Sequence, residues 1–184
     1  DDRRHGLITT EGMLFPSTRL EYHFVDPHRR MLVKRAALED GHLVVRSKDD
    51  DFETDIATLA TIVSYNEPSE ERTVVVLEGQ RRIRIQKVDR SGKFAAADWE
   101  RLEAVGIDET VCETVAADIL GTLQRLSDAG IELAERVANQ AADADDAAAV
   151  ADIVGSVTFD QLDEQRELLT ETDVLARLRR VEAR

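Results

Sequence analysis

Four histidines are the residues whose chemistry could most readily support proton transfer or metal binding. They are His5, His23, His28 and His42, and none belongs to a His-Glu-x-x-His motif or has a histidine four residues away. Zinc peptidases need that spacing because both imidazoles must reach one ion from the same helix face. We expect His5 in a disordered tail and His23 on the solvent side of a strand. The histidines therefore predict surface roles, with no metal and no cofactor.

The single cysteine, Cys112, is the only thiol that could act as a nucleophile. A catalytic thiolate needs a cation or base beside it, whereas the neighbouring Glu109 and Glu113 would raise the thiol pKa. One cysteine also excludes an internal disulfide and a thiol-rich zinc site. We predict an inert, partly buried side chain.

Two further segments have the composition of ligand-binding loops but lack the required spacing. The acidic segment 49–55 has neither the Gly nor the Glu that an EF-hand loop places at its sixth and twelfth positions. Gly92-Lys93 has neither the upstream Gly nor the following Ser or Thr of a phosphate-binding loop. The chain is therefore predicted not to be an enzyme by itself. A small hydrolase that uses His23 or His42 with a carboxylate is the weaker alternative.

The charge balance bears on the class of partner. The 184 residues include 24 basic and 38 acidic side chains, which give a formal net charge of −14. Such a chain repels polyanions at long range, and eight aromatic residues are few for base stacking. One basic run could still contact phosphate: Arg81, Arg82, Arg84, Lys87, Arg90 and Lys93. Pairing of this run with local acids is favoured, and nucleic-acid binding is kept as the alternative function.

Targeting signals and membrane segments are absent from the sequence pattern. No apolar run approaches 18 residues, and the first residues contain no signal-like apolar stretch. We therefore expect a cytoplasmic protein that does not insert into a membrane.

The sequence pattern changes near residue 105, from one typical of β-strands to one typical of α-helices. Residues 1–105 contain β-branched, alternating segments and all three prolines, which predict a curled, barrel-like β domain with one helix. The helix is expected to begin at Asp26-Pro27, to place Met31, Arg35 and Leu38 on one face, and to end at Gly41. The predicted strands are 20–24, 42–46, 57–65, 73–77, 82–86 and 94–99, with turns at 66–69 and 78–80.

Residues 106–184 are predicted to form a small α-helical bundle. Apolar residues recur there at spacings of three and four, and residues 101–184 hold 8 basic against 19 acidic side chains. Asp108 is the expected N-cap of the first helix, and Gly155 is expected to end the third. Thr158 or Asp160 is the expected cap of the fourth, and the last helix is expected from Thr172. Each apolar stripe is narrow, so no helix is expected to be fully buried.

Several segments, taken in order, resemble the amino-terminal substrate-binding domain of Lon proteases. The central one is Thr73-Val74-Val75-Val76-Leu77-Glu78-Gly79-Gln80-Arg81-Arg82-Ile83-Arg84-Ile85, which matches a buried strand, a Glu-Gly pair and a second strand. Met13-Leu14-Phe15-Pro16 resembles the family's opening Phe-Pro-Gly segment. Glu171-Thr172-Asp173-Val174-Leu175-Ala176-Arg177-Leu178 resembles its closing motif. The resemblance covers nearly the whole chain.

This resemblance implies an α+β fold, a PUA-like curled β barrel followed by a small helical bundle. It implies a non-catalytic polypeptide-recognition module that binds unfolded or partner proteins for ATP-dependent proteolysis, while the ATPase and Ser-Lys peptidase lie in other parts of a longer protease. A stand-alone regulatory protein and a PUA-like nucleic-acid-binding protein are the alternatives. Whether the chain associates weakly with itself is left open.

The sequence also departs from the family pattern. Ser17 stands where the family usually has Gly, and Ala57 replaces another common Gly. These departures favour a divergent member and leave open whether it is free-standing. Phe52, in the acidic segment, and Tyr65, before a turn, are the predicted exposed contacts for polypeptides, with ordinary packing as the alternative for both.

Overall fold

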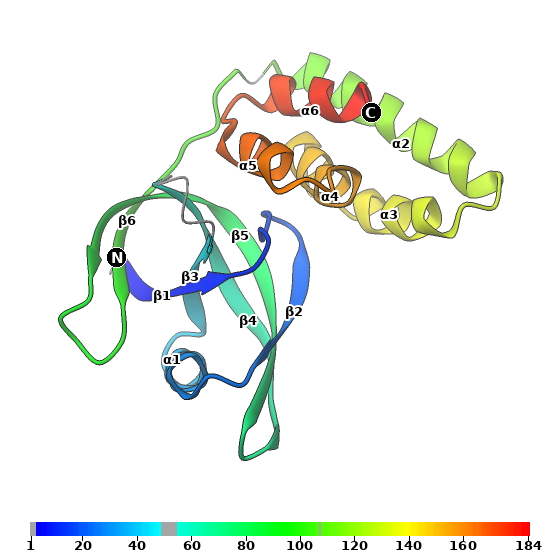
Figure 1. Ribbon diagram of the computed structural model, residues 1–184. Coiled ribbons are helices and arrows are strands. Elements are labelled where there is room, and N and C mark those ends of the chain that lie inside the picture. The colour runs from blue at the N-terminus through cyan, green and yellow to red at the C-terminus, as the bar shows by residue number, and fades with distance from the viewer. Residues whose placement is uncertain (1–2, 49–54, 107) are drawn as a thin grey trace. The chain divides into compact units, whose positions relative to one another are not determined.

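The computed structural model describes residues 3–48, 55–106 and 108–184. These residues form two compact units, one ending at Leu102 and one beginning at Glu103. Within the described ranges, the first unit contains six strands and one helix and the second contains five helices (Figure 1). The fold class is α+β, as predicted.

The strands of the first unit pair into a sheet that closes on itself. They are β1 (Arg4–Thr10), β2 (Arg19–Phe24), β3 (His42–Ser47), β4 (Ile56–Ser69), β5 (Arg72–Asp89) and β6 (Ala96–Arg101). The order is β2-β5-β4-β3-β1-β6, and a further pairing of β5 with β6 completes a ring of five strands. Among these six described strands, β1 and β3 form the one parallel pair, and the other pairs are antiparallel. This ring is the predicted curled barrel. β2 is not part of the ring and, within the described ranges, pairs with β5 alone (Figure 1).

The single helix of this unit, α1 (Pro27–Leu38), begins as predicted but buries a different face. The Asp26 carboxylate accepts a hydrogen bond of 2.9 Å from the Arg29 amide. Met31 and Leu38, however, are exposed, and the buried side chains are Leu32, Val33 and Ala36. The segment 31–33 is apolar at three successive positions, so periodicity alone could not select the face that meets the sheet.

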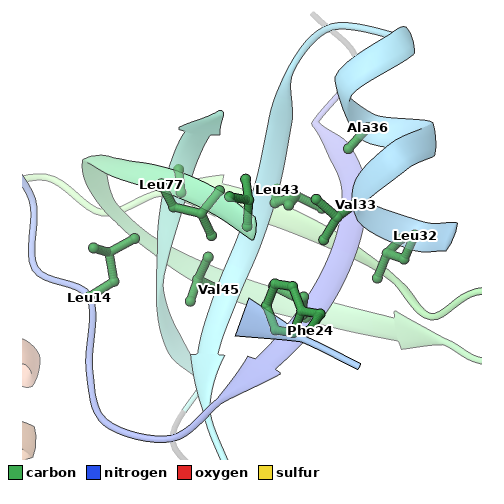
Figure 2. Packing of buried hydrophobic residues seen from close by; sticks show 11 residues of the cluster. Leu14, Phe24, Leu32, Val33, Ala36, Leu43, Val45 and Leu77 are labelled. Carbon is green, nitrogen blue, oxygen red and sulfur yellow. The ribbon is translucent and has the colours of Figure 1, made fainter. Parts of the chain in front are cut away.

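That buried face of α1 contributes to the main hydrophobic core. Figure 2 shows Leu32, Val33 and Ala36 directed toward side chains from the strands, including Leu43 and Phe24. A second buried cluster lies around Val44, Ile83 and Ala97. Because β3 contributes Leu43 to one cluster and Val44 to the other, both faces of this strand are buried.

The predicted turn at residues 78–80 is wrong, because β5 is one continuous strand through them. The β4–β5 register shifts between Leu59 and Ala60, which are opposite Arg81 and Gly79, so Gln80 is the extra residue of a β-bulge. A Cβ on Gly79 would lie 2.1 Å from the Phe15 carbonyl oxygen. Glycine is therefore needed for close backbone contact at a bend. The predicted turn at 66–69 is also part of β4, and the chain reverses at residues 70–71 instead.

The second unit consists of α2 (Glu109–Asp128), α3 (Glu132–Ala142), α4 (Ala147–Thr158), α5 (Leu162–Thr170) and α6 (Val174–Glu182). Asp108 caps α2 as predicted, with its carboxylate accepting from the Val111 amide. The predicted cap of α5, Thr158 or Asp160, is wrong, since the N-cap position is Gln161. The last helix is expected from Thr172, whereas α6 begins at Val174 with Asp173 as its N-cap.

The expected end of α4 at Gly155 is also wrong, because the helix continues to Thr158. Every residue from Ala149 to Gly155 is buried, whereas Val157 is 44% exposed, so α4 is not buried along its whole length. A Cβ at Gly155 would lie 2.2 Å from Leu168 Cδ2, so this glycine provides space for the side chain of α5 rather than ending a helix. α4 is therefore the central helix of the bundle, and the others pack on it with narrower apolar faces.

Across the described ranges, no helix is long and apolar enough to cross a membrane.

Candidate polypeptide-binding surface

Cys112 does not form a nucleophilic site. It is 2% exposed on α2. Burial raises its pKa, and the carboxylates of Asp108 and Asp173 raise it further. The predicted inert role agrees with this environment, although the responsible acids are not the predicted Glu109 and Glu113.

Two members of the basic run, Arg82 and Arg84, are buried or paired with acidic side chains. Arg84 pairs with Asp55 at 3.1 Å and lies 3.9 Å from Glu100. Arg82 is only 9% exposed, and Lys93 Nζ lies 5.6 Å from the centre of the Phe94 ring. Arg82 and Arg84 are therefore less available to phosphate than the sequence pattern suggested, and the nucleic-acid alternative stays a prediction for the rest of the run.

The predicted position of His5 is wrong, because it lies in β1 and not in a disordered tail. Its Nε2 is 2.9 Å from Asp40 Oδ2, and its ring centre is 5.7 Å from that of His42. Partial burial raises the pKa of Asp40, but the His42 amide and the imidazoles of His5 and His42 lower it more, so the net shift is downward. Sequence spacing could not reveal this cluster, because strand pairing brings His5 to the other two residues.

Of the two predicted polypeptide contacts, Tyr65 can be placed and Phe52 lies outside the described residues. Tyr65 is half-buried on β4 and packs against the main core. Burial raises the pKa of Tyr65 to about 12, with a further contribution from the neighbouring Glu67 carboxylate. Tyr65 is thus partly a packing residue, and its contact with polypeptides stays a prediction.

Tyr65 belongs to a group of apolar side chains that the prediction did not assemble. In the sheet register, Leu20 and Ile62 lie on either side of Leu77, and Tyr22 and Tyr65 lie on either side of Val75. Residues paired in this way share one face of the sheet. Leu77 and Val75 are fully buried, whereas Leu20 is 41% exposed and the other three are half-buried. We call Leu20, Tyr22, Ile62 and Tyr65 the apolar patch.

Two residues of the apolar patch, Leu20 and Tyr22, belong to β2, which has one unpaired edge. Among the described strands, β2 pairs only with β5, so the backbone amides and carbonyls on its other edge have no strand partner. Arg19, Glu21 and His23 are exposed along β2, and His23 Nε2 lies 2.6 Å from Glu21. Charged side chains of this kind discourage edge-to-edge aggregation while leaving the backbone accessible.

Comparison with known proteins identifies the family. The model of the ATP-dependent protease La (LON) substrate-binding domain matches residues 7–183. The chain belongs to this family. No curated protein sequence matches it.

Solved structures of Lon N-terminal domains share the fold of this chain. The N-terminal domain of Mycobacterium avium complex Lon protease has 20% identity and a TM-score of 0.73, and the match covers 97% of this chain and 95% of that one. The Lon N-terminal domain protein from Xanthomonas campestris has 17% identity and a TM-score of 0.72, with 98% and 97% covered. These matches are to the non-catalytic substrate-binding domain of Lon, and none of them is to its protease domain.

The Lon-family motifs have clear physical roles in this fold. Gly79 of the central motif is the close-contact position at the β5 bulge, where its amide donates to the Thr18 carbonyl and its carbonyl accepts from the Ser17 amide. Ser17 has φ of +60°, which is the left-handed conformation that favours glycine. The departure from the family's usual Gly at this position therefore places a side chain in a conformation that costs free energy.

Proposed function

We propose that this Lon-type domain recognises extended polypeptide segments at the β2 edge, presenting unfolded or partner proteins for ATP-dependent proteolysis. The observation that supports this most directly is the unpaired edge of β2 beside the apolar patch. The family supports substrate recognition in general, and the surface named here is our own assignment.

The recognition mechanism would be addition of a β-strand. An extended segment can pair its main-chain amides and carbonyls with those of β2, which requires no particular sequence. Leu20 is then available to an apolar side chain of the segment on this face, with Tyr22 beside it on the same face. Such binding favours unfolded chains, because a folded protein rarely has a free extended segment to offer.

The experiment measures amide NMR shifts of the full chain titrated with a permanently unfolded model protein. We expect shifts along β2 and around the apolar patch. Leu20→Asp should weaken binding by about tenfold or more, since it removes an apolar contact beside the paired edge. Amide dispersion of the variant verifies that it folds.

Leu38→Asp is the matched control, because Leu38 is 80% exposed on α1 and lies outside the apolar patch. Equal loss of binding in both variants, or shifts confined to the helical unit, would contradict the proposal. A parallel titration with single-stranded RNA at low salt tests the alternative, and salt-sensitive shifts along the basic run of β5 would favour it.

A further inference from the structure

Three potential metal ligands converge where β1 and β3 begin. These strands run parallel, with Gly6 opposite Leu43, so the preceding residues His5 and His42 are neighbours. Asp40, in the turn after α1, lies between them. One donor atom from each of the three side chains lies within 4.8 Å of the other two. Their proximity is thus imposed by strand register and by the short connection from α1 to β3.

The local hydrogen bonds prepare His42 and Asp40 for coordination. His42 Nδ1 lies 2.8 Å from the Asp40 carbonyl oxygen, which only accepts, so Nδ1 carries a proton. The neutral ring therefore has its lone pair on Nε2. The His42 amide also donates to Asp40 Oδ1 at 3.0 Å and holds this carboxylate beside the ring. Backbone bonds of this kind typically orient histidine ligands in metal sites.

The cluster is accessible to an ion. It lines a cavity of about 490 Å³ within the first unit, together with Gly6 of β1 and Phe94. The side chains of Asp40 and His42 are 55% and 36% exposed, and that of His5 is 12% exposed. An ion could enter from solvent and keep a water molecule on the cavity side.

We propose that His5, Asp40 and His42 form a binding site for a divalent transition-metal ion of the Zn²⁺ class. Two imidazoles and one carboxylate suit Zn²⁺, Co²⁺ or Ni²⁺ and leave a fourth position for water. Tetrahedral Zn²⁺ holds its donors about 3.4 Å apart. The donor atoms here lie within 4.8 Å of one another, so no gap needs to close by more than about 1.4 Å. An ion held in this way links the start of β1 to the turn between α1 and β3.

Trp99, the only tryptophan, provides a reporter for this site. Its indole Nε1 donates to His5 Nδ1 at 2.9 Å, so the neutral His5 carries its proton on Nε2, facing Asp40. Coordination through Nε2 moves that proton to Nδ1, where it would face the indole N–H. Metal binding therefore breaks the Trp99–His5 hydrogen bond, while His5 keeps a single proton.

The experiment titrates Zn²⁺ into the full metal-free chain at pH 7.5, with calorimetry and the Trp99 indole ¹H–¹⁵N resonance as readouts. We expect saturation at one ion per chain, a shift of the indole resonance and a higher Tm, since the ion binds the folded state. Co²⁺ should give the visible absorption of a tetrahedral nitrogen–oxygen site. Mg²⁺ should have no effect, because it prefers six oxygen ligands.

His42→Ala and Asp40→Asn should each weaken Zn²⁺ binding by about tenfold or more. Asp40→Asn keeps an oxygen that can accept the hydrogen bond from the His42 amide. A loss of Zn²⁺ binding in this variant can therefore be assigned to lost coordination and not to unfolding. His23→Ala is the matched control, because it removes a histidine that also contacts a carboxylate, on β2. No saturable binding, an unmoved indole resonance, or an equal loss in His23→Ala would overturn the proposal.

Discussion

Asp152 of α4 and Arg177 of α6 form an ion pair in the interior of the helical unit. Arg177 Nη1 lies 3.2 Å from Asp152 Oδ1 and 3.4 Å from Oδ2, and the two side chains are 2% and 3% exposed. Arg177 is the arginine of the closing motif that resembles the Lon family. Its role is structural, because it neutralises the one acidic residue buried on the central helix.

Asp152→Ala should lower the free energy of unfolding by about 3–5 kcal/mol, because it leaves the Arg177 charge buried without this carboxylate. Urea denaturation followed by circular dichroism measures the change. Replacing both residues, Asp152→Leu with Arg177→Met, should recover most of the loss. Arg35→Ala, which removes an exposed pair with Glu39, should cost only about 0.5 kcal/mol. A similar small cost for Asp152→Ala would show that the buried pair is not needed for stability.

Gly79→Ala should strongly destabilise the barrel unit, by about 3 kcal/mol or more. Its Cβ would lie 2.1 Å from the Phe15 carbonyl oxygen, and this neighbour is backbone, which cannot rotate away. Gly121→Ala on α2 is the matched substitution, because a Cβ there meets nothing within 4 Å. It should stabilise the chain by about 0.5–1 kcal/mol through higher helix propensity. Thermal melts of Gly79→Ala and Gly121→Ala measure the two changes in stability. Loss of stability in both variants would contradict close backbone contact as the reason for glycine at position 79.

Ser17→Gly should stabilise the chain by about 1 kcal/mol, since Ser17 has φ of +60° and a Cβ is unfavourable in that conformation. The backbone bond from the Ser17 amide to the Gly79 carbonyl is kept in the variant. Chemical denaturation measures the gain. Ser127→Gly, within α2, should instead cost roughly 0.5 kcal/mol, because that position is helical. An unchanged or lower midpoint for Ser17→Gly would show that the conformation is not strained.

Tyr65 should ionise at about pH 12 in the folded chain, because burial and then the Glu67 carboxylate raise its pKa. The unfolded side chain ionises near 10. Unfolding is therefore favoured progressively as pH rises from 10 to 12, and the contribution of Tyr65 to stability is complete only below 10. Absorbance titration near 295 nm follows the phenolate. Comparison with Tyr65→Phe isolates this group from Tyr22, whose pKa burial also raises. A Tyr65 transition near pH 10 would contradict the structural assignment.

Much of the local structure was predictable because it depends on neighbouring residues. Asp26 and Asp108 were identified as N-caps since a capping carboxylate accepts from an amide only three positions away. The alternation of Ile83 and Ile85 predicted a strand for the same reason, since side-chain direction in a strand follows residue parity.

The remaining features depend on contacts between distant segments. Glu78-Gly79-Gln80 has the composition of a turn, yet pairing with β2 and β4 keeps it extended and makes Gly79 a close-contact residue. Gly155 has the composition of a helix end, yet the Leu168 side chain packs against it within a continuous helix. In both cases tertiary packing overrides local preference.

By itself, the sequence determined the two-part α+β organisation, the helix starts and the lack of a recognisable catalytic motif. Only the tertiary structure decided which side chains meet: the apolar patch across β2, β5 and β4, and His5 beside Asp40 and His42. The physical reason is that strand register joins residues that are distant in the chain, such as Gly6 with Leu43 and Leu20 with Leu77. No local periodicity encodes that pairing, whereas propensity, capping and hydrophobic alternation all act within a few residues of the chain.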